Sequence, residues 1–117
     1  MKKNYFERSE EWCSCCHKGG LVPAFRDKLN EAREIAGVPF ILTSAFRCSA
    51  HNEEVGGSPT SSHLHGLAVD IKCEDGRKRF IIVEALRSVG LNRIGFGKNF
   101  IHVDMDGQKP QNVYWVY

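Results

Sequence analysis

The chain has 117 residues, of which 42% are hydrophobic and 26% are charged, and this length predicts one compact domain with a modest core over residues 1–117. The formal net charge is only +2 and no run of like charge occurs, so we expect no nucleic-acid binding. The longest apolar stretches fall far short of the ~20 residues that cross a bilayer, which excludes a membrane span.

The N-terminal segment bears on where the chain is made. Its lysines are followed by Glu7, Glu10 and Glu11 in place of an apolar stretch, so we expect no secretory signal peptide. We therefore expect synthesis in the cytoplasm, where thiols stay reduced.

Five cysteines are present, an odd number that cannot pair completely. Three of them crowd together over residues 13–16, whereas Cys48 and Cys73 stand alone in the sequence. A structural zinc site usually takes two separated pairs of ligands. We therefore expect reduced, partly buried cysteines that pack an N-terminal loop, and a structural zinc site is the alternative.

In the first half of the chain, apolar residues at helical spacing predict a helix over residues 21–36, with a proline in its first turn and a glycine at its end. A short buried strand over residues 38–44 follows. The polar, small residues of 49–66 predict an exposed loop, with a short helix at 50–55.

In the second half, residues 67–71 alternate, which places Asp70 on the face of a strand opposite a buried apolar row. A second helix is predicted over residues 75–89. Three short strands follow in the manner of an antiparallel meander, over residues 93–96, 100–105 and 113–117. The order of elements predicts an α+β fold, a small antiparallel sheet flanked by helices.

Two histidines and one aspartate form a candidate metal site. His63 lies in the polar loop, Asp70 in one predicted strand and His102 in another. Imidazole and carboxylate are ligands of catalytic zinc, and three such ligands leave a position for a water molecule whose pKa the metal lowers. The same spacing also arises by chance, so the surrounding residues matter.

Those surroundings resemble the peptidase M15 family. The resemblance rests on a Ser-x-x-Arg motif over residues 44–47, a Ser-His-x-x-Gly-x-Ala-x-Asp motif over residues 62–70, and the segment 100–104, and it runs over nearly the whole chain. The family comprises zinc D-Ala-D-Ala carboxypeptidases and phage-type L-alanyl-D-glutamate endopeptidases, and it shares a fold with the hedgehog signalling domain. The resemblance implies a hedgehog-like zinc fold of the DD-peptidase kind.

The resemblance also implies roles for individual residues. It implies Zn²⁺ bound by His63, Asp70 and His102, and hydrolysis of a peptide bond in bacterial peptidoglycan. Arg47 resembles an arginine that faces the substrate carboxylate or the developing oxyanion, for which a guanidinium is suited; its alternative role is an ion pair within the domain. Ser62 resembles a serine that touches substrate, and a local loop hydrogen bond is its alternative role.

One departure from the family concerns the general base. Relatives commonly carry Glu or Asp three positions before the last histidine ligand, where this chain has Asn99, which cannot accept a proton at neutral pH. Asp104 lies on the same strand face as His102, so we expect it to act as the base; the alternative is that it only orients His102. Asp106 and His65 are weaker candidates, and we expect no role for the histidines at positions 17 and 51.

The leading functional prediction is a monomeric zinc metallopeptidase that cleaves the peptide stems of the cell wall. The alternative is a metal-bearing module that binds the cell wall or a protein without turnover, because the fold does not fix the function and Asn99 replaces an acid. A cysteine-rich zinc-ribbon adaptor is a third possibility that rests on residues 13–17 alone. The sequence leaves open whether a carboxypeptidase or an endopeptidase is present, and whether it serves a phage, a prophage or the host cell.

Overall fold

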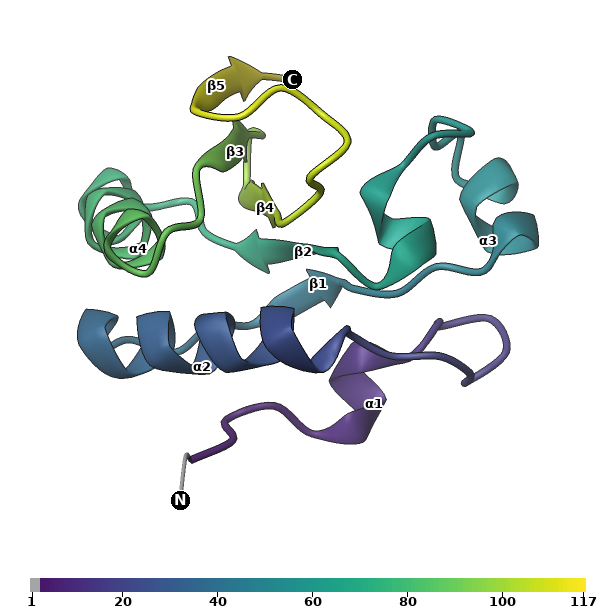
Figure 1. The fold of residues 1–117 in the computed structure, drawn as a ribbon, viewed down its shortest axis with the longest axis horizontal. Coiled ribbons are helices and arrows are strands. Elements are labelled where there is room, and N and C mark those ends of the chain that lie inside the picture. The colour runs from purple at the N-terminus through teal and green to yellow at the C-terminus, as the bar shows by residue number, and fades with distance from the viewer. Residues whose placement is uncertain (1–2) are drawn as a thin grey trace.

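The computed structural model describes residues 3–117; Met1 and Lys2, which fall within the predicted domain range, lie outside the described residues. The described chain is an α+β structure, as the sequence predicts (Figure 1). In chain order its elements are α1 (Arg8–Glu11), α2 (Pro23–Ala36), β1 (Leu42–Ser44), α3 (Ser49–Glu54), the 3₁₀ helix η1 (Ser62–His65), β2 (Ala68–Lys72), α4 (Gly76–Ser88), β3 (Arg93–Phe96), β4 (Phe100–Asp104) and β5 (Val113–Val116).

The strands form one sheet in the order β1-β2-β4-β3-β5. The pairs from β1 to β3 are antiparallel, but β5 pairs with β3 in parallel. The predicted all-antiparallel sheet is therefore wrong at this edge. The reason is the end of the sheet at which β5 begins. Strand β4 ends with Asp104 opposite Arg93 at the start of β3, and β5 starts at that same end with Val113 opposite Arg93, so it runs in the direction of β3.

The two long helices begin and end close to the predicted positions. Pro23 occupies the first turn of α2, and Gly37 ends it in the left-handed conformation with φ +69°. The carboxylate of Asp75 accepts a hydrogen bond from the Lys78 N–H at 3.2 Å and so caps α4. Within the described residues every helix falls short of the length and apolarity that crossing a bilayer requires.

Two elements differ from the prediction. The strand predicted over residues 38–44 is reduced to β1, and Pro39 in the missing part has no N–H to donate to a sheet. The helix α1 is not predicted by the apolar spacing. It forms at a capping box, in which the carboxylate of Glu10 accepts from the Glu7 N–H at 2.7 Å.

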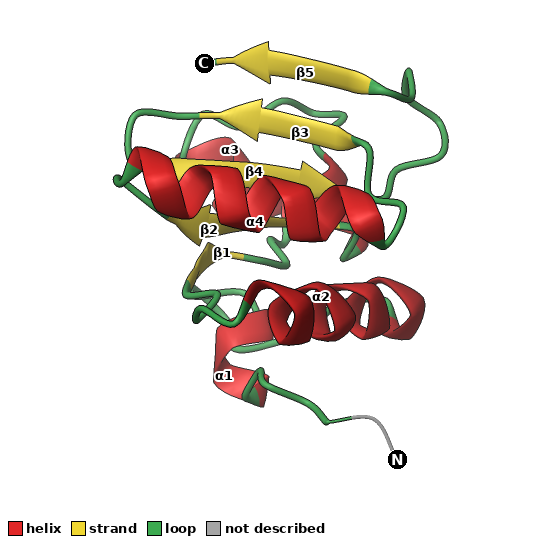
Figure 2. Ribbon diagram, turned by 90° about the vertical axis from the view of Figure 1, so that its left-hand side faces the viewer, coloured by secondary structure: helices red, strands yellow, loops and turns green. Residues whose placement is uncertain are grey.

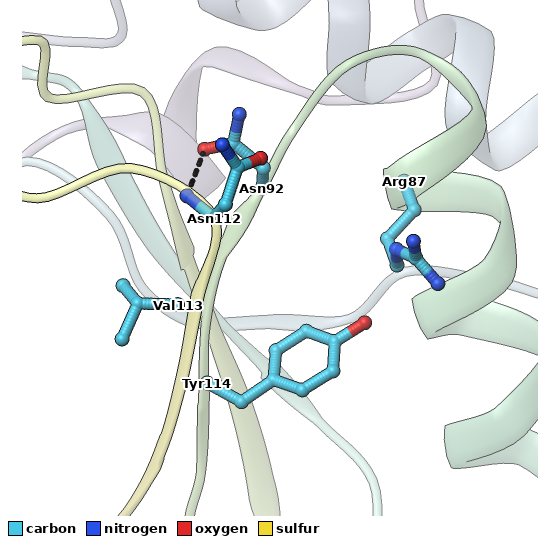
Figure 3. Close-up of a pocket in the computed structure, with 5 residues that line it drawn as sticks. All are labelled: Arg87, Asn92, Asn112, Val113 and Tyr114. Atoms are coloured by element: carbon cyan, nitrogen blue, oxygen red, sulfur yellow. Dashed lines mark hydrogen bonds between the residues drawn. The ribbon is translucent and has the colours of Figure 1, made fainter.

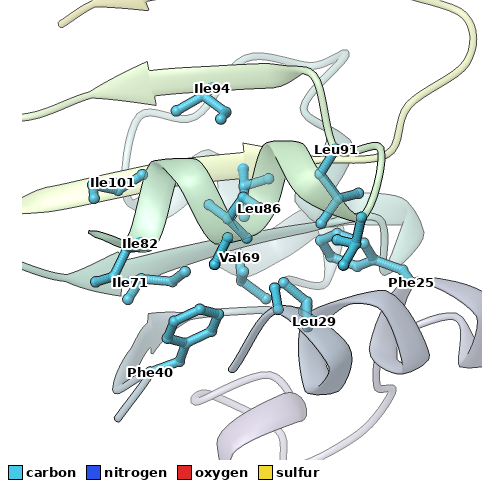
Figure 4. Packing of buried hydrophobic residues seen from close by; sticks show 14 of the residues in the cluster. Phe25, Leu29, Phe40, Val69, Ile71, Ile82, Leu86, Leu91, Ile94 and Ile101 are labelled. Atoms are coloured by element: carbon cyan, nitrogen blue, oxygen red, sulfur yellow. The ribbon is translucent and has the colours of Figure 1, made fainter. Parts of the chain in front are cut away.

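Helices α2 and α4 pack together and cover one face of the sheet, while α3 lies on the other side (Figures 1 and 2). The core lies between this helical layer and the sheet. Figure 4 shows Leu29 of α2 and Leu86 of α4 beside Val69 of β2, and Ile82 of α4 near Ile101 of β4. Because side chains alternate along a strand, the residues next to these point to the opposite face, and that face carries the polar side chains described below.

Candidate metal centre

The structure brings His63, Asp70 and His102 together. One ligand atom from each lies within 4.8 Å of the others. Asp70 Oδ1 lies 3.0 Å from His102 Nδ1 and 3.4 Å from His63 Nε2. Strand pairing explains part of this, because Asp70 of β2 is directly opposite His102 of β4 in the antiparallel register.

The third residue, His63, comes from η1. This short helix is capped by the Ser61 hydroxyl, which accepts from the His63 N–H at 3.3 Å. Gly66 ends η1 with φ +68°, and a Cβ at this position would collide with the carbonyl oxygen of Gly20. The turn therefore requires glycine, and it returns the chain to β2 so that the imidazole faces the sheet.

Each imidazole is held through its other nitrogen. His63 Nδ1 lies 2.7 Å from the Ala45 carbonyl oxygen. Since a carbonyl can only accept, Nδ1 carries the proton and Nε2 presents a lone pair towards Asp70. His102 Nε2 lies 2.8 Å from Asp104 Oδ2, so donation to this carboxylate leaves Nδ1 to face Asp70. Histidine ligands of metals are oriented in this way.

The donor set fits zinc. Two imidazole nitrogens and one carboxylate oxygen converge from three backbone elements, both histidines are buried, and Asp70 retains some exposure to solvent. Burial raises the pKa of Asp70, but the imidazoles of His102 and His63 outweigh this effect and hold the pKa well below its usual range. The carboxylate is therefore charged, and the group can hold a divalent cation while leaving coordination positions open.

Asp104 is not available to solvent. It is 2% exposed, and its Oδ1 accepts from Arg93 Nε at 2.7 Å and from the Asp106 N–H at 3.2 Å, while its Oδ2 faces His102. Burial raises its pKa, but the contacts with His102 and Arg93 lower it overall. Asp104 contacts the ring nitrogen of His102 that points away from Asp70. This position argues against proton transfer and favours the alternative role, orientation of His102.

Arg93 is not among the site residues that the sequence predicts. Residues 93–96 are predicted only as a strand, although a charged residue at the start of an otherwise apolar strand is a signal that could have identified it. Arg93 is directly opposite Asp104 in the β3–β4 register, and its guanidinium also lies 5.0 Å from the Trp115 ring. That ring lies 5.5 Å from His102 and over Gly95, where any Cβ would collide with the indole. Gly95 thus allows an aromatic wall next to the candidate ligand.

Arg47 lies beside the three candidate ligands. Its N–H donates to the His63 carbonyl at 3.1 Å, and its Nη2 donates to the Ser61 hydroxyl at 3.3 Å. Its buried Nε has no hydrogen-bond partner among residues 3–117. The alternative role predicted for Arg47 is an ion pair within the domain, but within the same range Arg47 forms none. Because no ion pair neutralises it within this range, the guanidinium charge remains available to a ligand.

Ser62 is 2% exposed and its hydroxyl is already engaged. It donates to Asp106 Oδ2 at 2.8 Å and accepts from Lys109 Nζ at 2.9 Å. These partners come from the segment after β4, far away in sequence, and not from the local loop. The network ties η1 to that segment, which also places Asp106 in a supporting position away from the three candidate ligands.

A cleft of about 350 Å³ opens over the candidate metal centre. It is lined by loop residues on one side and by strand residues on the other: Arg47, Gly56, Gly57, Ser58, Ser61, Ser62, His63, Asp70, Arg93, Phe100, His102, Asp104, Lys109, Trp115 and Tyr117. Asn99 and His65 are exposed and do not line this cleft. Asp70 and Asp104 are the carboxylates among these lining residues.

A separate pocket of about 210 Å³ lies between α4 and the β5 edge of the sheet (Figure 3). It is lined by Arg87, Asn92, Asn112, Val113 and Tyr114. These side chains include no carboxylate, imidazole or thiol, so this pocket offers no candidate metal ligand or general base.

The fold adds a fourth cysteine to the group at residues 13–16. Cys48, which stands alone in the sequence, lies with Cys13, Cys15 and Cys16, and the four sulfur atoms are within 4.8 Å of one another. The sequence could not show this because the 13–16 loop and Cys48 belong to irregular segments with no periodic pattern. Cys73 remains separate and is buried in the core.

A family model described as peptidase M15 matches residues 4–104. The matched range contains His63, Asp70 and His102, and ends before β5 and its Trp115. A search among curated proteins gave no significant match.

Proposed function

Because the chain belongs to the peptidase M15 family, we propose that it is a zinc-dependent peptidase that hydrolyses peptide bonds in the stem peptides of bacterial peptidoglycan. The observation that carries the proposal is the convergence of His63, Asp70 and His102 beneath an open cleft. Both imidazoles present the nitrogen that a metal would need, since their other nitrogens are engaged with the Ala45 carbonyl and Asp104.

His63 Nε2, His102 Nδ1 and an Asp70 oxygen would hold the zinc ion. When bound at such a site, zinc acts as a Lewis acid and lowers the pKa of a coordinated water. The chain itself supplies the orientation: β2 and β4 hold two ligands in register, and η1 holds the third. This arrangement leaves the side of the group that faces the cleft open to a peptide.

Arg47 is the residue best placed to recognise the substrate. Arg47 lines the cleft, and no carboxylate of residues 3–117 forms an ion pair with its guanidinium. A planar set of donors suits either a terminal carboxylate or the oxyanion that develops on the attacked carbonyl. Lys109 and Arg93 also line the cleft, but they are paired with Asp106 and Asp104. Among the described residues that line the cleft, Arg47 is therefore the unpaired cation that an anionic stem peptide would meet.

Ser62 and Asp104 act as supporting residues in this proposal. The engaged hydroxyl of Ser62 holds η1 in place, and we assign it no direct contact with substrate. Asp104 orients His102 and balances the charge of Arg93. The assignment for Asp104 follows the alternative role stated above, whereas the partners of Ser62 are distant residues and not the local loop of its alternative.

One observation favours a second function. Asn99 is exposed outside the cleft, and Asp104 is enclosed by its partners. The remaining carboxylate of the cleft that could act as a base is Asp70, which is itself a proposed metal ligand. Hydrolysis then has no dedicated carboxylate base among the lining residues. The second candidate is a zinc-bearing module that holds a cell-wall peptide or a protein without turnover.

The test uses the purified full chain loaded with zinc and incubated with peptidoglycan and soluble muropeptides. Mass spectrometry is expected to find shortened stem peptides, and loss of a single terminal residue would separate carboxypeptidase from endopeptidase cleavage. His63→Ala should abolish the products, whereas His65→Ala, an exposed residue of the same 3₁₀ helix, should retain them. Absence of products from a chain that holds metal at this site contradicts hydrolysis, and co-sedimentation with the cell wall would then support the binding module.

A further inference from the structure

A second cluster of metal-binding side chains lies outside the cleft. It is formed by four cysteines from two segments, the loop after α1 and the residue that precedes α3, which lie at the same end of the molecule (Figure 1). Cys13 and Cys48 are 35 residues apart in sequence, and their sulfur atoms are 3.6 Å apart. None of the four belongs to the His63, Asp70 and His102 group.

The sulfur positions match a shared cation better than a pair of disulfides. Cys15 Sγ lies 3.5 Å from Cys13 Sγ and 3.3 Å from Cys48 Sγ. Three sulfurs thus form a nearly equilateral triangle, and Cys16 completes a group of four within 4.8 Å. A zinc ion bound to sulfur at ~2.3 Å separates its tetrahedral ligands by about 3.8 Å. In a disulfide each sulfur has one partner, whereas here each of three sulfurs has two equivalent neighbours.

Backbone groups around the sulfurs favour thiolates. The Cys48 N–H points to Cys13 Sγ at 3.4 Å, and the His51 N–H points to Cys48 Sγ at 3.4 Å. Amide donors stabilise the negative charge that cysteine carries when it binds a metal. Cys15 and Cys16 are exposed, so an ion can enter from solvent.

We propose that Cys13, Cys15, Cys16 and Cys48 bind one zinc ion as four thiolates, forming a structural metal centre separate from the one in the cleft. Four soft sulfur ligands select zinc over magnesium or calcium, and a complete set of four leaves no position for substrate. Binding releases the thiol protons to solvent and involves no redox change.

The position of this centre indicates what it does. Cys48 directly follows Arg47, and the same two segments are joined by the hydrogen bond from the Phe46 N–H to the Glu11 carbonyl at 3.1 Å. The ion would therefore fasten the N-terminal segment to the backbone that carries Arg47. Because the unfolded chain has no preformed site, the binding free energy of the metal stabilises the fold.

The test uses the full chain with both cleft histidines removed, His63→Ala with His102→Ala, so its result does not depend on the proposed function. After purification in reductant with limiting zinc, metal analysis and native mass spectrometry are expected to find one zinc per chain. Cys16→Ser in this background should lose the ion, and Cys73→Ala, which changes a cysteine outside the cluster, should keep it. Absence of zinc, iron in its place, or a mass two hydrogens lower per disulfide overturns the proposal.

A second measurement covers the case in which Cys16→Ser does not fold. Cobalt(II) substituted into the variant with all five cysteines intact should give the strong sulfur-to-metal charge-transfer absorption of thiolate ligands. Removal of the metal by a chelator should lower the thermal midpoint of that variant. A cobalt spectrum without thiolate charge transfer refutes the proposal irrespective of the cysteine variants.

Discussion

Asp104→Asn separates the two roles considered for Asp104. The substitution keeps the size of the side chain but replaces one oxygen by an NH₂ group. The amide oxygen satisfies Arg93 Nε, so the NH₂ group faces His102 Nε2 at the place where Oδ2 accepts at 2.8 Å. Two donors cannot face each other, and His102 must move or change tautomer. The alternative tautomer places a proton on Nδ1, the nitrogen that faces Asp70 and would bind the metal.

The expected magnitude follows from this geometry. Groups that orient a histidine ligand contribute about ten- to hundred-fold to metal affinity. At ~1.4 kcal/mol per factor of ten, this corresponds to about 1.4–2.8 kcal/mol of zinc binding free energy. The fold also loses stability, because the Arg93 side chain is only 9% exposed and loses its charged partner. Asparagine still accepts one hydrogen bond, so we expect a loss below the ~3–5 kcal/mol for removing a buried partner entirely.

The assay is competition for zinc between the protein and a chelator of known affinity, measured beside turnover. Asp27→Asn, the same chemical change at an exposed position of α2, is the control and should leave zinc affinity unchanged. If Asp104→Asn abolished turnover while zinc affinity remained that of the wild type, Asp104 would be a proton-transferring residue and the orientation argument would be wrong.

Two further substitutions test how the site is supported. Gly66→Ala should lower the free energy of urea unfolding by more than the ~1–2 kcal/mol of the left-handed conformation alone, because a Cβ there collides with a backbone carbonyl. The same substitution should weaken zinc binding. Gly37→Ala is the control: its φ is similar but the space around it is open, so it should show only the conformational cost. Glu11→Gln weakens the paired hydrogen bonds of 2.6 and 2.8 Å to Arg26. Because water reaches part of Arg26, we expect a loss of about 1 kcal/mol in urea unfolding, against no change for the exposed Glu31→Gln.

The sequence predicts most elements because their signals are local. Helix α2 is predicted from its apolar spacing and its terminal residues, and the alternation around Asp70 places its side chain opposite the core. The parallel pairing of β5 is not predicted, because it depends on β5 joining β3 instead of β4 and starting at the end of the sheet where β4 finishes. That information is global and has no counterpart in the residues of β5 themselves.

The candidate site also combines local and long-range information. The motif residues can be recognised in the sequence, but the partner of Asp104 depends on strand register, which places Arg93 opposite it. The role of Asp104 could not be decided from the strand face alone, since a base and an orienting residue require the same face. The distinction comes from the contacts of both carboxylate oxygens, which the folding of β3 against β4 brings about.

The short segment from Ala45 to Cys48 connects the two proposed metal centres. The Ala45 carbonyl fixes the tautomer of His63, Arg47 lines the cleft, and Cys48 belongs to the thiol cluster. A displacement of Cys48 would therefore move the acceptor of His63 and the guanidinium together, because one stretch of backbone carries both. Loss of the thiol-bound ion should consequently reduce metal affinity in the cleft, although no cysteine lines it, and zinc titration of Cys16→Ser with both cleft histidines intact measures this coupling directly. An unchanged affinity at the cleft would show that the Phe46 to Glu11 hydrogen bond and its neighbours hold the segment without the ion.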